Sequence, residues 1–251
     1  MRVLKFGGSS VANAQNIKLV LDIVVNKAKE EKLIVVVSAF SKITDLLQLA
    51  SQKAAAGDES FKEILADLET KHLDALKELI PVSEQSSLLS HIKRIINHLD
   101  TFLDGCYLLG ELSPRTSDTI LSFGELLSSY IIAEALKQKL KNSSYKDSRE
   151  LIKTNNSFGK AVVNFDVSNK LIVDFFASNE NQVVVMPGFI AASLDGINTT
   201  LGRGGSDYTA AILAGALHAN ELEIWTDVNG RFTANSKIVQ EAQPIVFISY
   251  Q

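Results

Sequence analysis

The chain is poor in cysteine, with Cys106 as the only one among its 251 residues. An intrachain disulfide is therefore impossible, and a reducing, cytoplasmic setting is the simplest expectation. Cys106 itself is expected to be a small buried apolar side chain. Histidine is also scarce, and His72, His91, His98 and His218 lack the spacing of a metal site. We therefore expect no metal ion held by protein ligands, and we place His91 and His98 on a solvated helix face.

Long apolar runs and a strong excess of one charge are missing as well. The N-terminal apolar stretch is too short for a signal peptide, and no run approaches the roughly 18 apolar residues that span a bilayer. Acidic residues number 29 and basic residues 25, which gives a net charge of −4. So small an excess offers no general attraction for nucleic acid or for an anionic membrane. We expect a soluble protein with neither partner, in which any anion is held by local groups.

Short apolar runs alternate with longer helical patterns. The runs at 33–37 and 183–185 are continuously apolar, which is typical of central strands in a parallel sheet. Strand and helix in alternation predict a mainly parallel sheet covered by helices on both faces. The predicted strands are 2–6, 33–38, 182–186 and 222–225, and the predicted helices beside them are 16–30 and 206–218.

A large helical block lies between these two sets of strands. Apolar residues recur every three or four positions over 44–112 and 117–140. Pro81 and Pro114 interrupt the block, because proline cannot continue a helix. The polar segment 141–156 is expected to be rich in loops, but it is too short to mark a domain boundary. A length of 251 residues fits one large α/β domain or two small ones.

The most informative stretch is TTLGRGGSDYTAA at 199–211. Three glycines surround Arg203, and Ser206 and Asp207 then lead into an alanine-rich helical pattern. Glycine permits a positive φ and close approach of other atoms, and a helix N-terminus offers free N–H groups to an anion. The stretch therefore indicates an anionic ligand. A tight turn followed by a Ser or Asp helix cap explains the same residues without a ligand.

A second candidate is VLKFGGSS at 3–10, where a predicted strand runs into two glycines. Lys5, near the carboxyl end of that strand, should point into the crevice where open α/β sheets bind ligands. Gly7 and Gly8 would bring backbone N–H groups up to phosphate oxygens, and Lys5 would add a point charge. The lysine precedes the glycines, so this is not the Walker pattern. An exposed strand-end lysine before a simple turn is the alternative.

The segment VVVSAFSKIT at 35–44 is another strand that leads into hydroxyl side chains. Ser38 and Thr44 could hydrogen-bond a polar small molecule at the same edge of the sheet. Serine and threonine also cap helices, so Ser41 or Thr44 could instead cap a helix that starts near Asp45.

Glu125 lies in the otherwise apolar stretch LSFGELLSS at 121–129. A carboxylate is costly to bury without a partner, so Glu125 could face an ammonium group on a substrate. It could equally lie on a polar stripe of its helix with Ser122 and Ser129.

The segment EIWTDVNGRFTANSK at 223–237 combines a predicted strand with an Asn-Gly turn. A functional interpretation places a nucleotide's sugar and base beside Thr226 and Asp227, with Lys237 near its phosphates. The turn at Asn229 and Gly230 needs no ligand to explain it.

Taken together, six segments resemble aspartokinases, in order and over the whole chain. They are KFGGSSV (5–11), VSAFSKIT (37–44), SFGELLS (122–128), PGFIA (187–191), TTLGRGGSDYTAA (199–211) and IWTDVNG (224–230). Acetylglutamate and uridylate kinases share the fold and the lysine-glycine start, but not GRGGSDYTAA together with WTDV. The resemblance implies the amino acid kinase fold, a three-layer α/β/α sandwich with a mainly parallel central sheet. It also implies ATP-dependent phosphorylation of L-aspartate to 4-phospho-L-aspartate, the first step towards lysine, threonine and methionine, with Mg²⁺ bound mainly through the nucleotide phosphates.

The resemblance also implies roles for individual residues. Lys5 would stabilise the transferring phosphoryl group, Arg203 would hold the α-carboxylate through its planar fork, and Glu125 would pair with the α-ammonium. No general base is needed because the attacking carboxylate is already ionised, so Asp207 would organise Lys5 and the substrate. The catalytic set is Lys5, Gly8 and Asp207, and the substrate set is Ser38, Thr44, Glu125, Phe189, Arg203, Ser206 and Asp207. The nucleotide set is Lys5, Gly7, Gly8, Ser9, Thr226, Asp227, Phe232 and Lys237.

The chain departs from the pattern of these kinases at several positions. Ser9 stands where threonine is usual, and Phe123 stands where arginine or histidine commonly precedes the Gly-Glu pair. FTANSK at 232–237 replaces Tyr-Thr-x-Asp-Pro-Arg, so that Lys237 keeps the positive charge but loses bidentate reach. The chain ends at ISYQ, where these kinases continue through a helix with a nucleotide-contacting lysine and then regulatory ACT domains.

We therefore expect residues 1–251 to be a C-terminally truncated catalytic domain without ACT domains. Catalytic domains of this family occur both in stand-alone aspartokinases and fused to homoserine dehydrogenase. Whether the protein forms a homo-oligomer stays open. Two other functions also stay open at this point. One is a kinase for a related carboxylate, and the other is a non-catalytic module that senses nucleotides or amino acids.

Overall fold

A five-stranded parallel sheet forms the centre of the computed structural model, which describes residues 1–226, 230, 239 and 243. The strand order is β3, β5, β2, β1, β8, and every neighbouring pair is parallel. The bounds are β1 Arg2–Phe6, β2 Leu33–Val37, β3 Ser143–Tyr145, β5 Val183–Pro187 and β8 Glu221–Trp225. The four strands predicted from the sequence are confirmed to within one residue at each end, whereas β3 was not predicted.

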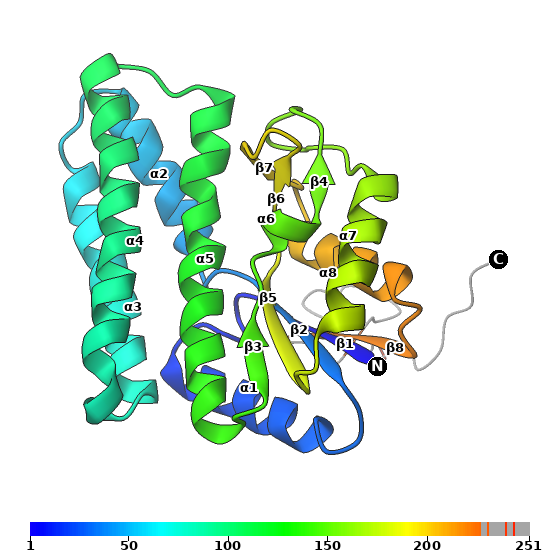
Figure 1. Ribbon diagram of the computed structural model, residues 1–251. Coiled ribbons are helices and arrows are strands. Elements are labelled where there is room, and N and C mark those ends of the chain that lie inside the picture. Colours follow the sequence, from blue (N-terminus) through cyan, green and yellow to red (C-terminus); the bar gives the residue numbers. More distant parts are fainter. Residues whose placement is uncertain (227–229, 231–238, 240–242, 244–251) are drawn as a thin grey trace.

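Alternate side chains of the central strands enter two separate cores, one on each face of the sheet. Leu4 and Val35 belong to the core shared with the helical block, whereas Val3 and Ile34 belong to the opposite core. Successive side chains of a strand point to opposite faces, so a strand covered on both sides must be apolar throughout. The predicted three-layer α/β/α sandwich is confirmed (Figure 1). One face carries α1 (Ala14–Lys27) and α5 (Pro114–Lys139), and the other carries α7 (Phe165–Ser178) and α8 (Gly205–Ala216).

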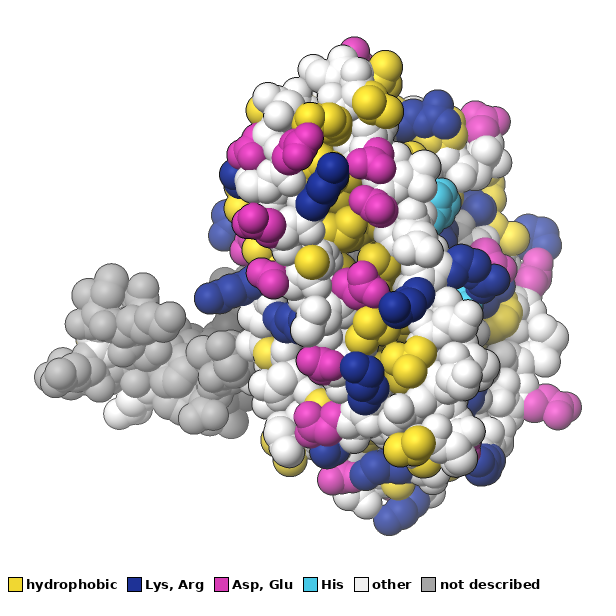
Figure 2. Space-filling view, turned by 90° about the vertical axis from the view of Figure 1, so that its left-hand side faces the viewer, with side chains coloured by type: hydrophobic (Ala, Val, Ile, Leu, Met, Phe, Trp, Pro, Cys, Tyr) yellow, Lys and Arg dark blue, Asp and Glu magenta, His cyan; other side chains and the backbone are white. Residues whose placement is uncertain are grey.

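The helical block is a bundle that stands to one side of the sheet (Figure 1). It consists of α2 (Ile43–Ala55), α3 (Phe61–Leu79) and α4 (Val82–Leu109), packed against α5. Pro81 separates α3 from α4, and Pro114 occupies the first turn of α5, as the sequence predicted. Figure 2 shows acidic and basic side chains interspersed over this side of the molecule, in keeping with the small net charge.

Helix α5 is long and apolar enough to cross a membrane by length and composition alone. The expectation concerned continuous apolar runs of membrane-spanning length, which α5 does not contain, so it did not foresee a long helix of mixed composition that meets this criterion. However, 72% of its most apolar window is buried inside the protein. It packs against α2, α3 and α4 and against the strands β3 and β5, which is the setting of a central core helix.

The segment 141–156 contains more regular structure than its polar composition predicted. It forms β3, α6 (Ser148–Leu151) and β4 (Lys153–Thr154). Asp147 caps α6 by accepting a hydrogen bond from the Arg149 N–H, and the Ser148 hydroxyl donates to the Ile190 carbonyl. The polar residues thus serve as caps and tertiary contacts, so the expectation of a loop-rich segment was wrong for this part.

A second, smaller sheet lies beyond the carboxyl end of β5 (Figure 1). In it β4 pairs in parallel with β6 (Ile190–Ser193), and β6 pairs in antiparallel fashion with β7 (Asn198–Thr200). Because β7 is followed directly by the glycine-rich turn, this sheet sets the position of the turn beside the main sheet.

Candidate active site

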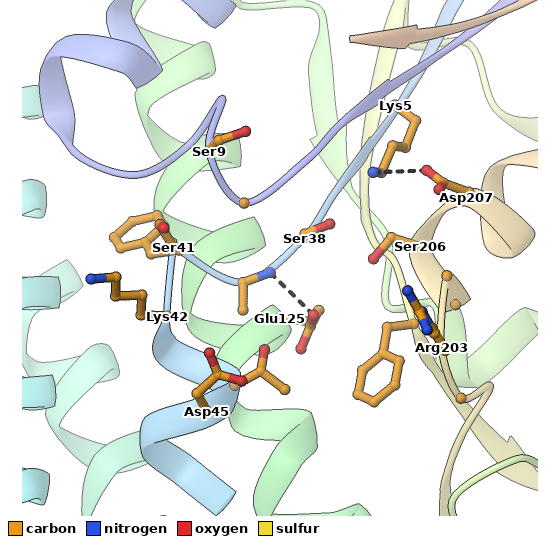
Figure 3. Close-up of a pocket in the computed structure, with 18 of the residues that line it drawn as sticks. Lys5, Ser9, Ser38, Ser41, Lys42, Asp45, Glu125, Arg203, Ser206 and Asp207 are labelled. Carbon is orange, nitrogen blue, oxygen red and sulfur yellow. Dashed lines mark hydrogen bonds and ion pairs between the residues drawn. The ribbon is translucent and has the colours of Figure 1, made fainter. Parts of the chain in front are cut away.

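A cavity of about 690 Å³ lies where the central strands end (Figure 3). Segments that follow β1, β2, β5 and β7 converge on it, and α5 supplies Glu125 from the bundle side. The carboxyl ends of neighbouring parallel strands meet at one edge of a sheet, which is where open α/β folds bind ligands. The lining residues with predicted roles are Lys5, Gly8, Ser9, Ser38, Thr44, Glu125, Phe189, Arg203, Ser206 and Asp207.

Lys5 and Asp207 form an ion pair across the cavity wall. The Lys5 Nζ lies 2.7 Å from Asp207 Oδ1, and the lysine side chain is only 12% exposed whereas the aspartate is 48% exposed. Lys5 comes from the end of β1, and Asp207 comes from the first turn of α8. The carboxylate fixes the direction of the ammonium group towards the cavity (Figure 3).

The glycine-rich turn adopts a backbone that only glycine takes readily. Gly202 and Gly204 have φ of 74° and 73°, and Gly204 stands at the start of α8 without any side-chain cap. The alternative of a Ser or Asp cap is therefore wrong. The backbone N–H groups of Ser206 and Asp207 donate no hydrogen bond in the part of the chain that the structure describes. The start of α8 thus offers two donors and a positive dipole end to an anion.

Arg203 is exposed on this turn and reaches the cavity from the side opposite Glu125 (Figure 3). It forms no ion pair with any residue in the described ranges. A guanidinium with an unoccupied fork beside two free N–H groups is suited to a carboxylate.

The segment after β5 packs very closely against the start of α8. A Cβ added to Gly188 would lie 2.6 Å from the Ser206 Cβ and 2.8 Å from its Cα. Phe189 adopts a φ of 64°, and its N–H donates to the Thr209 hydroxyl at 3.1 Å. This contact fixes where Ser206 and its neighbours stand in the cavity.

We expect Gly188→Ala to destabilise the protein by about 1–3 kcal/mol, because its methyl group would overlap the backbone of α8. The matched control is Gly215→Ala, within α8 itself, where no atom lies within 4 Å of the added Cβ. That change should stabilise the protein by about 0.5–1 kcal/mol through helix propensity. Urea unfolding gives the change in the free energy of unfolding for each variant. Changes of the same sign would contradict the close packing of Gly188 against Ser206.

The loop after β2 forms the wall opposite α8. Lys42 precedes α2 with a φ of 67°, and no side chain caps this helix, so the capping alternative for Ser41 or Thr44 is wrong. Instead, the Lys71 Nζ donates to the Ser41 carbonyl at 2.9 Å. Ser38 and Thr44 both line the cavity, as predicted.

Glu125 is buried, with only 3% of the residue exposed. Its Oε1 accepts from the Ala39 N–H at 3.1 Å, whereas its Oε2 has no hydrogen-bond partner (Figure 3). Burial raises the pKa of this carboxyl to about 8, although the Ala39 N–H opposes the shift. Ser122 and Ser129 are buried too, so the alternative of a solvated polar stripe is wrong. A carboxyl with one oxygen free is suited to a cationic group that enters the cavity.

The charged side chains favour an anion in the cavity at neutral pH. Burial keeps Glu125 protonated there, because its pKa lies above 7. The other charged side chains that line the cavity are three cations, Lys5, Lys42 and Arg203, and two anions, Asp45 and Asp207. Together they leave an excess of positive charge.

The two glycines after β1 have different roles. Gly8 lines the cavity beside Ser9, and a Cβ added to it would lie 3.1 Å from the Ala39 carbonyl oxygen. The Gly7 N–H instead donates to the Trp225 carbonyl oxygen at 3.4 Å. This bond continues the pairing of β1 with β8, and a contact of the Gly7 N–H with a phosphate stays a prediction.

The predicted nucleotide residues are only partly described. Thr226 is exposed and lines an adjoining cavity of about 240 Å³ with Trp225 and with Ser9, which lines both cavities. Asp227, Phe232 and Lys237 lie outside the described residues. Within the described ranges, no group of three or more His, Cys, Asp or Glu side chains is placed to hold a metal ion.

Cysteine and histidine have structural surroundings. Cys106 is buried, as expected. His72 is buried and stacks on Phe40, and its pKa is lowered to about 4 by burial. His98 is exposed, as predicted, but His91 is half-buried and stacks on Tyr130, so the solvated face was wrong for His91.

Asp118 is a buried positioning residue that the sequence reasoning missed. Both of its oxygens accept from the Gly159 N–H at 3.0 Å, and it accepts from the N–H and the hydroxyl of Thr200 at 2.9 Å. Burial raises its pKa, and these hydrogen bonds oppose the shift. Thr200 directly precedes the glycine-rich turn, so Asp118 anchors the turn to α5. The available signal was an acidic residue two helical turns before Glu125 on an apolar helix.

Comparisons with known proteins agree with this geometry. The model of the amino acid kinase family matches residues 1–251. The chain is 34% identical over 250 residues to the chloroplastic bifunctional aspartokinase/homoserine dehydrogenase 2 of Arabidopsis thaliana, covering 99% of this chain and 27% of that protein. It is 33% identical to lysine-sensitive aspartokinase 3 of Escherichia coli strain K12, over 99% of this chain and 54% of that protein.

The similarity extends to three dimensions. The crystal structure of E. coli aspartokinase III in complex with aspartate and ADP matches with a TM-score of 0.87 and 33% identity. The match covers 98% of this chain and 53% of that chain. The chain therefore spans between about a quarter and about half of the length of these relatives.

Proposed function

We propose that this chain, which belongs to the amino acid kinase family, carries the site at which ATP phosphorylates L-aspartate to 4-phospho-L-aspartate. The observation that carries the proposal is the convergence of Lys5, Glu125 and Arg203 on one cavity at the carboxyl ends of the strands. Relatives whose names include aspartokinase, at 33–34% identity over 99% of the chain, support it.

Three charged groups of L-aspartate have counterparts in the cavity. The α-carboxylate would meet the Arg203 guanidinium, which has no other ion-pair partner among the described residues. The α-ammonium would meet Glu125, whose Oε2 lacks a hydrogen-bond partner. The side-chain carboxylate would then lie towards Lys5, between the two walls of the cavity (Figure 3).

The chemical step needs positioning and charge cancellation rather than a base. An oxygen of the ionised side-chain carboxylate attacks the γ-phosphorus of ATP, the bond to the β,γ-bridging oxygen breaks, and ADP leaves with that electron pair. Both reactants are anions, so their approach must be stabilised by fixed positive charge. Lys5, held by Asp207 at 2.7 Å, supplies one such charge, and the N–H groups at the start of α8 supply dipoles. Mg²⁺ would enter on the ATP phosphates and add further positive charge.

Several assignments rest on this proposal. They are ATP with Mg²⁺ as the phosphoryl donor, a single catalytic domain over 1–251 and a cytoplasmic location, with a homo-oligomer as an open alternative to a monomer. The single cysteine and the burial of α5 inside the core support a soluble protein in a reducing compartment. A role in the synthesis of amino acids derived from aspartate follows from the proposed product.

A substrate panel tests the proposal. ADP release should be measured with L-aspartate, L-glutamate and N-acetyl-L-glutamate at equal concentrations. We expect L-aspartate to be preferred by at least about a hundredfold in kcat/KM, because N-acetylation removes the ammonium that pairs with Glu125 and a longer side chain displaces the acceptor from Lys5. A preference for glutamate or N-acetylglutamate would instead support the related carboxylate kinase.

A further inference from the structure

A second cavity, of about 350 Å³, lies between α4, α5 and the turn from β3 to α6. It shares no lining residue with the cavity of the proposed active site. Its volume falls within the range of small-molecule sites, about 300–1,000 Å³. Most of its lining residues come from α4 and α5, which run beside each other in Figure 1. The lining residues are His91, Ile95, His98, Phe102, Thr119, Phe123, Leu126, Tyr130, Tyr145, Asp147, Arg149 and Asn198.

One part of this cavity is lined by rings. His91 stacks on Tyr130 with centroids 4.2 Å apart, and Tyr130 meets Tyr145 edge-on at 6.2 Å. Phe102 and Phe123 also line the cavity, with ring centroids 6.1 Å apart. Such walls bind flat or bulky apolar groups, because ring faces and edges supply large contact areas. Phe123 adds a ring at the position where the resemblance led us to expect arginine or histidine.

The cavity also has a polar part, which is built around Arg149. Its Nε and Nη2 donate to the Asp147 carboxylate at 3.1 and 2.6 Å, and its Nη1 donates to the Asn198 Oδ1 at 3.0 Å. A guanidinium has five N–H donors, so one on Nη1 and one on Nη2 have no acceptor in the described part of the chain. The side chain is 25% exposed and its orientation is fixed from two sides.

The charge balance around the cavity limits what it can hold. Asp147 and Arg149 cancel each other, so the lining carries no net excess of positive charge for a polyanion. Burial and the neighbouring Arg94 lower the pKa of His91, although Glu134 opposes the shift, so the neutral form of this imidazole is favoured. A ligand with one negative charge can still use the two remaining N–H groups of Arg149.

We propose that this cavity binds a small carboxylate with an aromatic or bulky apolar body. The carboxylate accepts from the free N–H groups of Nη1 and Nη2 of Arg149, while the body lies against Phe102, Phe123 and Tyr130. Pairing of an ionised donor with an ionised acceptor gives the stronger class of hydrogen bond, and the ring walls contribute apolar burial.

The test uses 3-phenylpropionate as the probe and two compounds that each lack one of its features. 3-Phenylpropan-1-ol keeps the ring without the charge, and propionate keeps the charge without the ring. Titrations followed by protein NMR should show 3-phenylpropionate to bind at least about tenfold more tightly than either. Saturating L-aspartate should leave this affinity unchanged, because the two cavities are separate. The outcome does not depend on whether the protein phosphorylates aspartate.

Variants locate the site. Arg149→Met should abolish the preference for the acid over the alcohol, and Phe102→Ala should weaken the binding of both. Leu108→Ala is the matched control, because Leu108 lies on the same helix, is exposed and does not line the cavity. Phe102→Ala decides the question should Arg149→Met fail to fold. Equal binding of acid and alcohol, displacement by L-aspartate, absence of binding, or an unchanged affinity in Phe102→Ala would each overturn the proposal.

Discussion

Lys5→Ala is expected to lower the turnover of L-aspartate by at least about a hundredfold, while ATP and L-aspartate still bind. The ammonium group acts on the charge that develops during phosphoryl transfer, so its loss affects kcat more than substrate affinity. Asp207, its partner, is 48% exposed, so water can replace the lost ion pair and the fold should persist. Steady-state kinetics and calorimetric titration with each substrate separate the two effects.

The control for this variant is Lys18→Ala, which removes an exposed lysine paired with Glu78 on the surface of the molecule. It should leave kcat unchanged. Equal turnover in wild type and Lys5→Ala would refute the role of Lys5. Binding of both ligands without any turnover in the wild type would instead support a non-catalytic sensing module.

Glu125→Gln is expected to weaken L-aspartate binding by at least about tenfold and to stabilise the free protein at alkaline pH. The loss of affinity follows because a neutral amide replaces the carboxylate that would face the substrate ammonium. Near pH 7 the free wild type holds a proton on Glu125, and a docked ammonium would favour its release. Calorimetry in buffers of different ionisation enthalpy measures that release, which the variant should lack.

The stability effect follows from the raised pKa. The Glu125 carboxyl has a pKa of about 8 in the folded protein against 4.5 for the unperturbed side chain, so the folded state binds the proton more tightly. The free energy of unfolding must therefore fall as the pH rises from 4.5 through about 8. Glutamine cannot ionise, so relative to wild type the variant gains stability over this range, by at least about 1 kcal/mol at high pH.

Urea unfolding at pH 5 and at pH 9 measures this difference. The control is Glu134→Gln on the same helix, whose carboxylate pairs with Lys137 near the surface. This control should change stability by a similar amount at both pH values. A Glu125→Gln variant that gains no stability between pH 5 and pH 9 would contradict the buried, protonated state of Glu125.

The sequence predicted those parts of the fold and the site that local patterns encode. Continuous apolar runs identified β2 and β5, because strands covered on both faces admit few polar residues. Glycines at 202 and 204 indicated a turn with positive φ, which the structure has. The position of Lys5 and Ser38 at one edge also follows from the parallel strands β1 and β2, which end there, whereas Arg203 is placed by β7 of the second sheet.

Other features depend on contacts between distant segments and were missed for that reason. Nothing near Gly188 in the sequence reveals that Ser206 packs against it. Nothing near Gly7 in the sequence reveals that its N–H donates to the Trp225 carbonyl oxygen at the end of β8. Polar residues in 141–156 predicted loops because their capping and tertiary hydrogen bonds cannot be told from solvation in the sequence alone.

In the proposed complex, the side-chain carboxylate of L-aspartate lies towards Lys5 while its α-carboxylate is held by Arg203. Trapping the acyl phosphate with hydroxylamine, followed by mass spectrometry and NMR of the product, identifies which carboxylate received the phosphoryl group. We expect the β-hydroxamate of aspartate, formed only in the presence of ATP and strongly reduced in Lys5→Ala. The α-hydroxamate, or ATP-dependent ADP release without any hydroxamate, would contradict it.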